Sequence, residues 1–173
     1  MRVVAGELRG RKLVAPESKG TRPTTDRVRE AIFNALTSLD VLVGATVCDL
    51  YAGSGALGIE AISRGASHCT FVEKDRAALS AIHANIGALG LTGRTRVVAG
   101  DASRMSAGLD VHLAFVDPPY GFAGWDGLLA GLHAPFVVAE GDALVGAPDG
   151  WESIRAKRYG RTWVTFLRRG LNT

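Results

Sequence analysis

Apolar strand-like runs alternate with helical patterns through the centre of the chain, and this alternation limits the possible folds more than any other feature. The runs that predict strands cover residues 46–50, 68–73, 95–99 and 111–116. Helical patterns at 56–64 and 76–89 separate the first three. Nearly continuous apolar strands separated by helices are typical of a parallel sheet with helices on both faces. We therefore predict an α/β fold with three layers, α/β/α.

Basic residues are concentrated at the N-terminus. Residues 1–29 carry eight Lys and Arg against three acidic residues, an excess of +5 in a chain whose net charge is +3. Such a block either holds nucleic-acid phosphates or is a solvated arm without a role. We expect residues 1–22 to be a basic extension built on a β-hairpin with arms 2–5 and 12–14. A catalytic domain, 23–173, follows.

The regions flanking the central pattern are also interpretable. Either Thr24 or Thr25 is expected to cap a helix that runs to about Leu39. Residues 151–158 and 162–168 predict an antiparallel hairpin at the edge of the sheet. The hairpin region carries four basic residues, Arg155, Lys157, Arg158 and Arg161. These side chains either extend a phosphate-binding surface or form the solvated face of an edge strand.

Size and composition indicate a single globular core. The chain has 173 residues, 47% of them hydrophobic, and no apolar run reaches the ~20 residues that a membrane span needs. We expect a cytoplasmic monomer without a metal site. Cys48 and Cys69 lie in apolar runs and are expected to be buried free thiols.

A glycine-rich loop follows the first predicted strand. Gly53, Gly55 and Gly58 match the G-x-G-x-x-G pattern between a strand and a helix, and Glu73 lies 20 residues after Gly53. The glycines allow close approach of a ligand, and an acid at the position of Glu73 accepts hydrogen bonds from ribose hydroxyls. The loop therefore predicts a cofactor that contains adenosine.

Two further acidic positions favour S-adenosylmethionine over NAD. Asp49 precedes Gly53 by four residues, where a negative charge suits an ammonium and a sulfonium better than a pyrophosphate. Asp101 follows the third predicted strand and can accept the adenine amino group, and the small Ala102 beside it leaves room for the ring.

The sequence Asp117-Pro118-Pro119-Tyr120 ends the fourth predicted strand. Two prolines fix the backbone and remove two N–H donors, so the turn offers the Asp117 carboxylate and the Pro118 carbonyl as acceptors. Holding both hydrogens of an exocyclic base amine in this way frees its lone pair for attack on a methyl group. Tyr120 would stack on a base removed from its helix or loop.

These motifs resemble those of the class I S-adenosylmethionine-dependent methyltransferases. Residues 2–6, 9–13 and 22–30 resemble the N-terminal signature of the bacterial 16S ribosomal RNA guanine-N2 methyltransferase family (RsmD-type). The resemblance covers nearly the whole chain. It implies a Rossmann-like sheet of seven strands, and a substrate within the small ribosomal subunit or its assembly intermediates. One departure concerns residues 143–148, which lack the acidic residue expected after the fifth strand.

The resemblance also assigns roles to individual residues. Catalytic roles fall on Asp117, Pro118, Pro119 and Tyr120. Cofactor binding falls on Asp49, Tyr51, Gly53, Gly55, Glu73, Lys74, Asp101, Ala102 and Thr24. RNA binding falls on Arg2, Arg9, Arg11, Lys12, Arg22 and Arg27. For Thr24, a role as a simple helix cap remains open.

Three other functions compete with this interpretation. An adenine-N6 methyltransferase is compatible with the Asp117 motif, but the chain has little room for a target-recognition domain. An NAD-dependent oxidoreductase fits the glycine pattern, although no accompanying acid–base set is found. A non-catalytic ribosome-assembly factor that binds RNA is disfavoured by the intact Asp117 and glycine loop.

Overall fold

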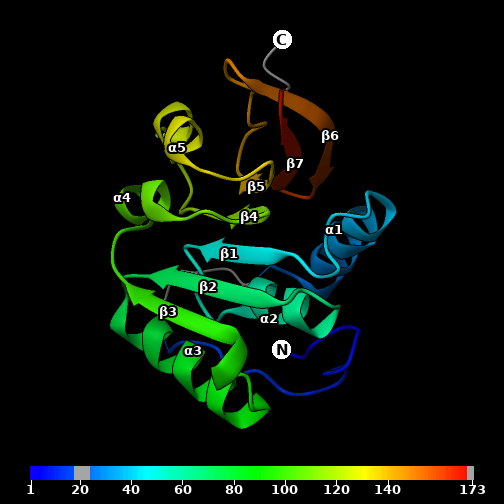
Figure 1. Ribbon diagram of the computed structural model, residues 1–173, viewed down its shortest axis with the longest axis vertical. Coiled ribbons are helices and arrows are strands. Elements are labelled where there is room, and N and C mark those ends of the chain that lie inside the picture. Colours follow the sequence, from blue (N-terminus) through cyan, green and yellow to red (C-terminus); the bar gives the residue numbers. More distant parts are fainter. Residues whose placement is uncertain (18–23, 171–173) are drawn as a thin grey trace.

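The computed structural model describes residues 1–17 and 24–170, and in these residues seven strands form one mixed sheet in the order β3-β2-β1-β4-β5-β7-β6 (Figure 1). The strands are β1 (Thr46–Leu50), β2 (His68–Glu73), β3 (Thr95–Ala99), β4 (Leu113–Val116), β5 (Phe136–Gly141), β6 (Trp151–Tyr159) and β7 (Thr162–Arg169). The helices are α1 (Asp26–Ser38), α2 (Ala56–Ser63), α3 (Arg76–Leu89), α4 (Ala102–Met105) and α5 (Trp125–Gly131), with short 3-10 turns η1 (Thr92–Arg94) and η2 (Ser106–Gly108). Strands β1 to β5 are parallel, and β6 and β7 are antiparallel additions at one edge. The predicted α/β fold with an antiparallel C-terminal hairpin is confirmed.

Helices cover both faces of the sheet, and each face has its own apolar core. On the face that we call the α1 face, helices α1, α2 and α3 pack against the sheet residues Val47, Phe71, Phe115, Val138, Val164 and Phe166. On the opposite face, the α5 face, α4 and α5 pack against the sheet residues Cys48, Leu50, Val72, Val116, Val137 and Leu167. The central strands are buried on both sides, which explains their nearly continuous apolar sequence.

The start of α1 resolves the roles of two adjacent threonines. The hydroxyl of Thr25 accepts a hydrogen bond from the Val28 N–H, so Thr25 caps the helix. The cap leaves the neighbouring Thr24 free for a different contact. At the other end, Leu39 forms the C-cap, as the apolar spacing of the sequence predicts.

Residues 1–14, which we call the N-terminal segment, form a hairpin with less strand pairing than predicted. A single antiparallel bridge joins Arg2 and Lys12. Val3 and Leu13 are buried in the same core as α1 and α2, so the segment has no separate core. This packing is inconsistent with a loose solvated arm.

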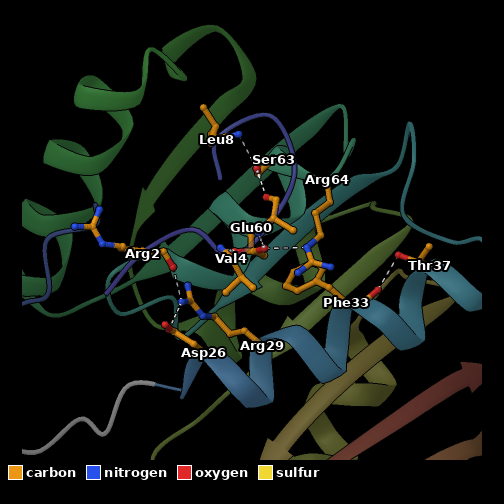
Figure 2. Close-up of polar contacts among 11 residues, drawn as sticks. Arg2, Val4, Leu8, Asp26, Arg29, Phe33, Thr37, Glu60, Ser63 and Arg64 are labelled. Atoms are coloured by element: carbon orange, nitrogen blue, oxygen red, sulfur yellow. Dashed lines mark hydrogen bonds and ion pairs between the residues drawn. The ribbon is translucent and has the colours of Figure 1, made fainter. Parts of the chain in front are cut away.

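Helix α2 holds the N-terminal segment through two polar side chains (Figure 2). The carboxylate of Glu60 accepts hydrogen bonds from the Val4 N–H at 2.8 Å and the Ala5 N–H at 3.0 Å. The Ser63 hydroxyl accepts from the Leu8 N–H at 3.0 Å and donates to the Ala5 carbonyl. Because Glu60 is buried, these donors compensate for the loss of its hydration.

Arg29 connects the N-terminal segment to α1. Its guanidinium is buried and donates to the Arg2 carbonyl at 2.6 Å and to the Asp26 carboxylate at 2.5 Å (Figure 2). One cation of the basic block is therefore used inside the protein and does not face solvent.

Among the helices that the structure describes, none is long and apolar enough to span a membrane.

Candidate active site at the carboxyl edge of the sheet

The carboxyl ends of the parallel strands meet at one edge of the sheet, where ligands of open α/β sheets bind. The strand register aligns Asp49 with Phe115, and Phe115 with Val138, across β1, β4 and β5. Asp117 lies two residues after Phe115, directly beyond the end of β4, and Glu140 lies two residues after Val138 on β5. Since side chains alternate between faces, Asp49, Asp117 and Glu140 all lie toward the α1 face.

The glycine loop after β1 leaves open space at one position and packs closely at another. Tyr51, Gly53 and Gly55 have left-handed φ angles of 60°, 58° and 79°. A Cβ placed on Gly53 would meet no atom within 4 Å, whereas a Cβ on Gly58 would lie 2.4 Å from the ring of Phe71. Gly58 therefore lets α2 pack against β2, and Gly53 leaves the backbone open to a ligand.

Glu73 is fixed at the end of β2 beside this loop. Its carboxylate accepts hydrogen bonds from the Gly53 N–H at 2.9 Å, the Lys74 N–H at 2.8 Å and the Asp75 N–H at 2.9 Å. The structure thus brings Glu73 next to Gly53 as the spacing of 20 residues predicts. This position suits a carboxylate that accepts hydrogen bonds from ribose hydroxyls.

Asp49 is buried below the loop, and its carboxylate accepts the Gly58 N–H at 2.9 Å. Burial raises the pKa of Asp49 well above its ordinary value, and the negative charges of Asp117 and Glu73 raise it further. A cationic group bound nearby would favour the ionised carboxylate. The Asp49 carboxylate therefore fits a cofactor that carries positive charge.

The side expected to hold adenine is assembled from the ends of β1, β2 and β3. The Tyr51 hydroxyl lies 2.6 Å from the Ser103 hydroxyl, and the Asp101 carboxylate accepts the Ser103 N–H at 2.9 Å. The Lys74 Nζ lies 3.9 Å from an Asp101 carboxylate oxygen, and Ala102 is buried. Four of the predicted cofactor residues therefore lie in one region.

The Asp117 motif adjoins the glycine loop directly. The Asp117 N–H donates to the carbonyl of Leu50, the last residue before the loop, at 3.4 Å. Pro118 is buried, whereas Pro119 and Tyr120 are exposed, Tyr120 by 58%. An exposed ring beside the turn is available for stacking on a base.

Thr24 joins two carboxyl groups in this site. Its hydroxyl lies 3.5 Å from an Asp117 oxygen and 3.2 and 3.4 Å from the two Glu140 oxygens. Burial raises the pKa of Asp117 to about 6. Burial and the nearby charge of Asp117 raise the pKa of Glu140 well above its ordinary value. Glu140 is the more deeply buried of the two carboxyl groups, so loss of hydration disfavours its charge more, and we expect the pair to share one negative charge near neutral pH.

Sequence reasoning did not identify Glu140 as a site residue. An acidic residue was expected after the fifth strand, where residues 143–148 have none, whereas Glu140 lies inside β5. Glu140 contacts Thr24 in the candidate site, so an acidic side chain from the fifth strand does take part in it. The available signal in the sequence was a charged residue, Glu140, that directly follows the apolar run 136–139.

The predicted RNA-binding residues differ in their surroundings. Arg9, Lys12 and Arg27 are exposed. Arg2 and Arg11 are also exposed, but they donate to the carbonyls of Gly10 and Ala88. Arg22 lies outside the described residues. No cluster of His, Cys, Asp and Glu able to hold a metal occurs in residues 1–17 and 24–170.

The strand order and the glycine loop after β1 define a class I methyltransferase fold. The chain belongs to the family described as Conserved hypothetical protein 95, which it matches over residues 1–168. This is the RsmD-type family that its motifs resemble, and that prediction is confirmed.

Individual relatives support the same assignment. The Escherichia coli K12 protein named Ribosomal RNA small subunit methyltransferase D is 47% identical over 122 residues, which cover 69% of this chain; the chain spans 60% of that relative's length. Bacillus subtilis YlbH, provisionally named an rRNA methyltransferase, is 36% identical and covers 98% of this chain and 99% of its own length. The structure of Escherichia coli yhhF, provisionally described as a methyltransferase, superposes with a TM-score of 0.85 at 35% identity, covering 98% of this chain and 97% of its own.

Proposed function

We propose that the protein transfers a methyl group from S-adenosylmethionine to the exocyclic N2 amine of a guanine in small-subunit ribosomal RNA. The observation that carries this proposal is the hydrogen bond from the Asp117 N–H to the Leu50 carbonyl. This bond attaches the turn that accepts a base amine to the loop that leaves room for a cofactor. The name of the Escherichia coli relative supports ribosomal RNA as the substrate.

The chain offers a consistent set of groups for the cofactor. Asp49, Gly53 and Glu73 would lie along its charged and ribose portions, and Asp101 with Ala102 would receive adenine. The cofactor supplies a methyl group on a positively charged sulfur. The open space at Gly53 and the raised pKa of Asp49 both fit such a ligand.

At the amine, the chain acts by position and charge. The Asp117 carboxylate and the Pro118 carbonyl accept the two N–H groups and turn the nitrogen lone pair away from the base ring. When the nitrogen gains a methyl group it becomes acidic, and the Asp117 carboxylate can take one of its protons. The proton then passes to solvent from this partly exposed position.

Glu140 and Thr24 orient the accepting carboxylate. The Thr24 hydroxyl can donate to either carboxyl group, and when Glu140 carries its proton that carboxyl group can donate to the Thr24 oxygen instead. The Thr24 hydroxyl hydrogen is then free to be donated to Asp117, whose pKa it lowers. This arrangement keeps Asp117 ionised while Glu140 stays neutral.

The test is methyl transfer from labelled S-adenosylmethionine to small ribosomal particles taken from bacteria that lack the family member. We expect label in N2-methylguanosine after digestion of the ribosomal RNA to nucleosides. Label in N6-methyladenosine would keep the mechanism and overturn the target base. Stable binding to the particle without any transfer would instead support a non-catalytic assembly factor.

A further inference from the structure

The C-terminal hairpin presents two cations on the same face of the sheet as the candidate site. Register across β5, β7 and β6 aligns Glu140 with Val164, and Val164 with Lys157. The preceding row aligns Val138 with Phe166, and Phe166 with Arg155. Directly paired residues share a face, so Arg155 and Lys157 lie toward the α1 face with Glu140.

Packing on the hairpin agrees with this placement. Val164 and Phe166 are buried in the core of the α1 face, and Tyr159, two residues beyond Lys157, packs against the same core. The Lys157 Nζ lies 5.3 Å from the centre of the Tyr159 ring. Arg158, the next residue, pairs with Trp163 and therefore belongs to the opposite face.

Among the residues that the structure describes, the same two cations lack acidic partners. Arg155 and Lys157 are exposed, and no carboxylate in the described part of the chain forms an ion pair with either. Arg168 on β7 also lies toward the α1 face, but it is paired with Glu152 at 2.7 Å. The Arg158 Nε donates to the Gly160 carbonyl at 2.9 Å.

The hairpin cations also lie close to the candidate site. Lys157 is two strands from Glu140, and neighbouring strands are separated by about 4.8 Å, which places the two backbones about 10 Å apart. Thr24 contacts Glu140 from the α1 face. Positive side chains beside the place where the target base would be held are suited to phosphates of the nucleotides next to it.

We propose that Arg155 and Lys157 form a phosphate-binding strip that holds the RNA backbone beside the target base. The inference rests on the proposed function, because an RNA substrate is what supplies the phosphates. The two faces of the hairpin then differ: the cations on the α1 face bind RNA, and Arg158 on the opposite face does not.

The test compares the Arg155→Ala/Lys157→Ala double variant and the single variants Lys157→Glu and Arg158→Glu with the unaltered protein. Binding to small ribosomal particles and to protein-free small-subunit rRNA is measured over a range of salt concentrations. Each lost phosphate contact on single-stranded RNA lowers the slope of log K against log salt by about 0.7, so the double variant should lose about 1.4. Lys157→Glu should weaken binding at least about tenfold, and its matched control Arg158→Glu should change it less than about twofold.

Thermal unfolding and S-adenosylmethionine binding of each variant show whether the fold is retained. Equal effects of Lys157→Glu and Arg158→Glu would overturn the strip and leave a solvated edge strand. A loss seen with particles but not with protein-free rRNA would assign the two cations to a protein surface instead. Methyl transfer by the unaltered protein in the same samples tests the proposed function separately, so the two failures are distinguishable.

Discussion

Asp117 directly follows β4 and Glu140 lies near the end of the neighbouring parallel strand β5, and one hydroxyl, that of Thr24, lies within 3.5 Å of both carboxyl groups. A buried and a half-buried carboxyl group in such proximity cannot both ionise without an electrostatic cost. We therefore expect the more deeply buried Glu140 to keep its proton while Asp117 ionises.

Asp117→Asn should reduce methyl transfer at least about 100-fold, because the amide cannot accept the proton of the methylated amine. The affinity for S-adenosylmethionine should change less than about threefold, since the glycine loop and Glu73 are untouched. Calorimetric titration and single-turnover transfer on the same sample measure both quantities. An equal loss of both would remove Asp117 from its proposed role.

The same substitution should make the protein more stable at neutral pH. A folded-state pKa of about 6 lies above the ordinary value of 3.8, so the folded state binds the proton more tightly than the unfolded chain. Stability contributed by this group is present below pH 4, falls as the pH rises toward 6 and stays low above it. Asp117→Asn removes this penalty, worth at most about 3 kcal/mol. Thermal unfolding midpoints should be higher for the variant at pH 8 and converge with the original protein near pH 4.

The activity of the unaltered protein should decline as the pH falls through about 6, because protonation of Asp117 removes the acceptor. Thr24→Val should move this limb to higher pH, by up to about one unit, since the Thr24 hydrogen bond lowers the pKa of Asp117. Thr24→Ser keeps the hydroxyl and serves as the control. Profiles of kcat against pH that coincide for all three proteins would contradict the assignment.

Glu140→Gln should retain methyl transfer within about threefold at pH 7.5, whereas Glu140→Ala should lower kcat at least about tenfold. The amide resembles the protonated acid and still donates to Thr24, and alanine leaves the Thr24 hydroxyl without that partner. Steady-state kinetics on ribosomal particles distinguish the two variants. If Gln is as damaging as Ala, Glu140 acts as an ionised carboxylate.

Gly6→Ala should destabilise the protein far more than Gly10→Ala. Both glycines have left-handed φ angles, 85° and 81°, so the backbone cost of about 1–2 kcal/mol is shared. A Cβ on Gly6 would lie 1.9 Å from the Ser63 carbonyl oxygen, but a Cβ on Gly10 would meet nothing within 4 Å. Denaturant unfolding should show an additional loss of about 1–3 kcal/mol for Gly6→Ala. Equal losses would mean that the N-terminal segment is not held against α2 in solution.

The sequence by itself determined the parts of this protein that depend on local patterns. Apolar runs separated by helical periodicity predict the parallel sheet, and the glycine spacing predicts the loop at its carboxyl edge. Glu73 and Asp117 could be placed because each directly ends a strand, and parallel strands bring their ends together. Gly90, which follows α3 with a left-handed φ angle, fits the ordinary preference for glycine at helix ends, whereas the same preferences left the cap of α1 open between Thr24 and Thr25.

Only the tertiary structure decided which distant residues share an environment. Thr24 meets Glu140 across 116 positions of sequence, and Glu60 receives the N–H of Val4 across 56. Both carboxyl groups lie inside regular elements, where periodicity reports burial but not the partner that makes burial tolerable. The face on which Lys157 lies likewise depends on the pairing register and on a bulge between Ser153 and Arg155. Register, burial and pKa depend on the neighbours that packing selects, because these interactions act through space and not along the chain.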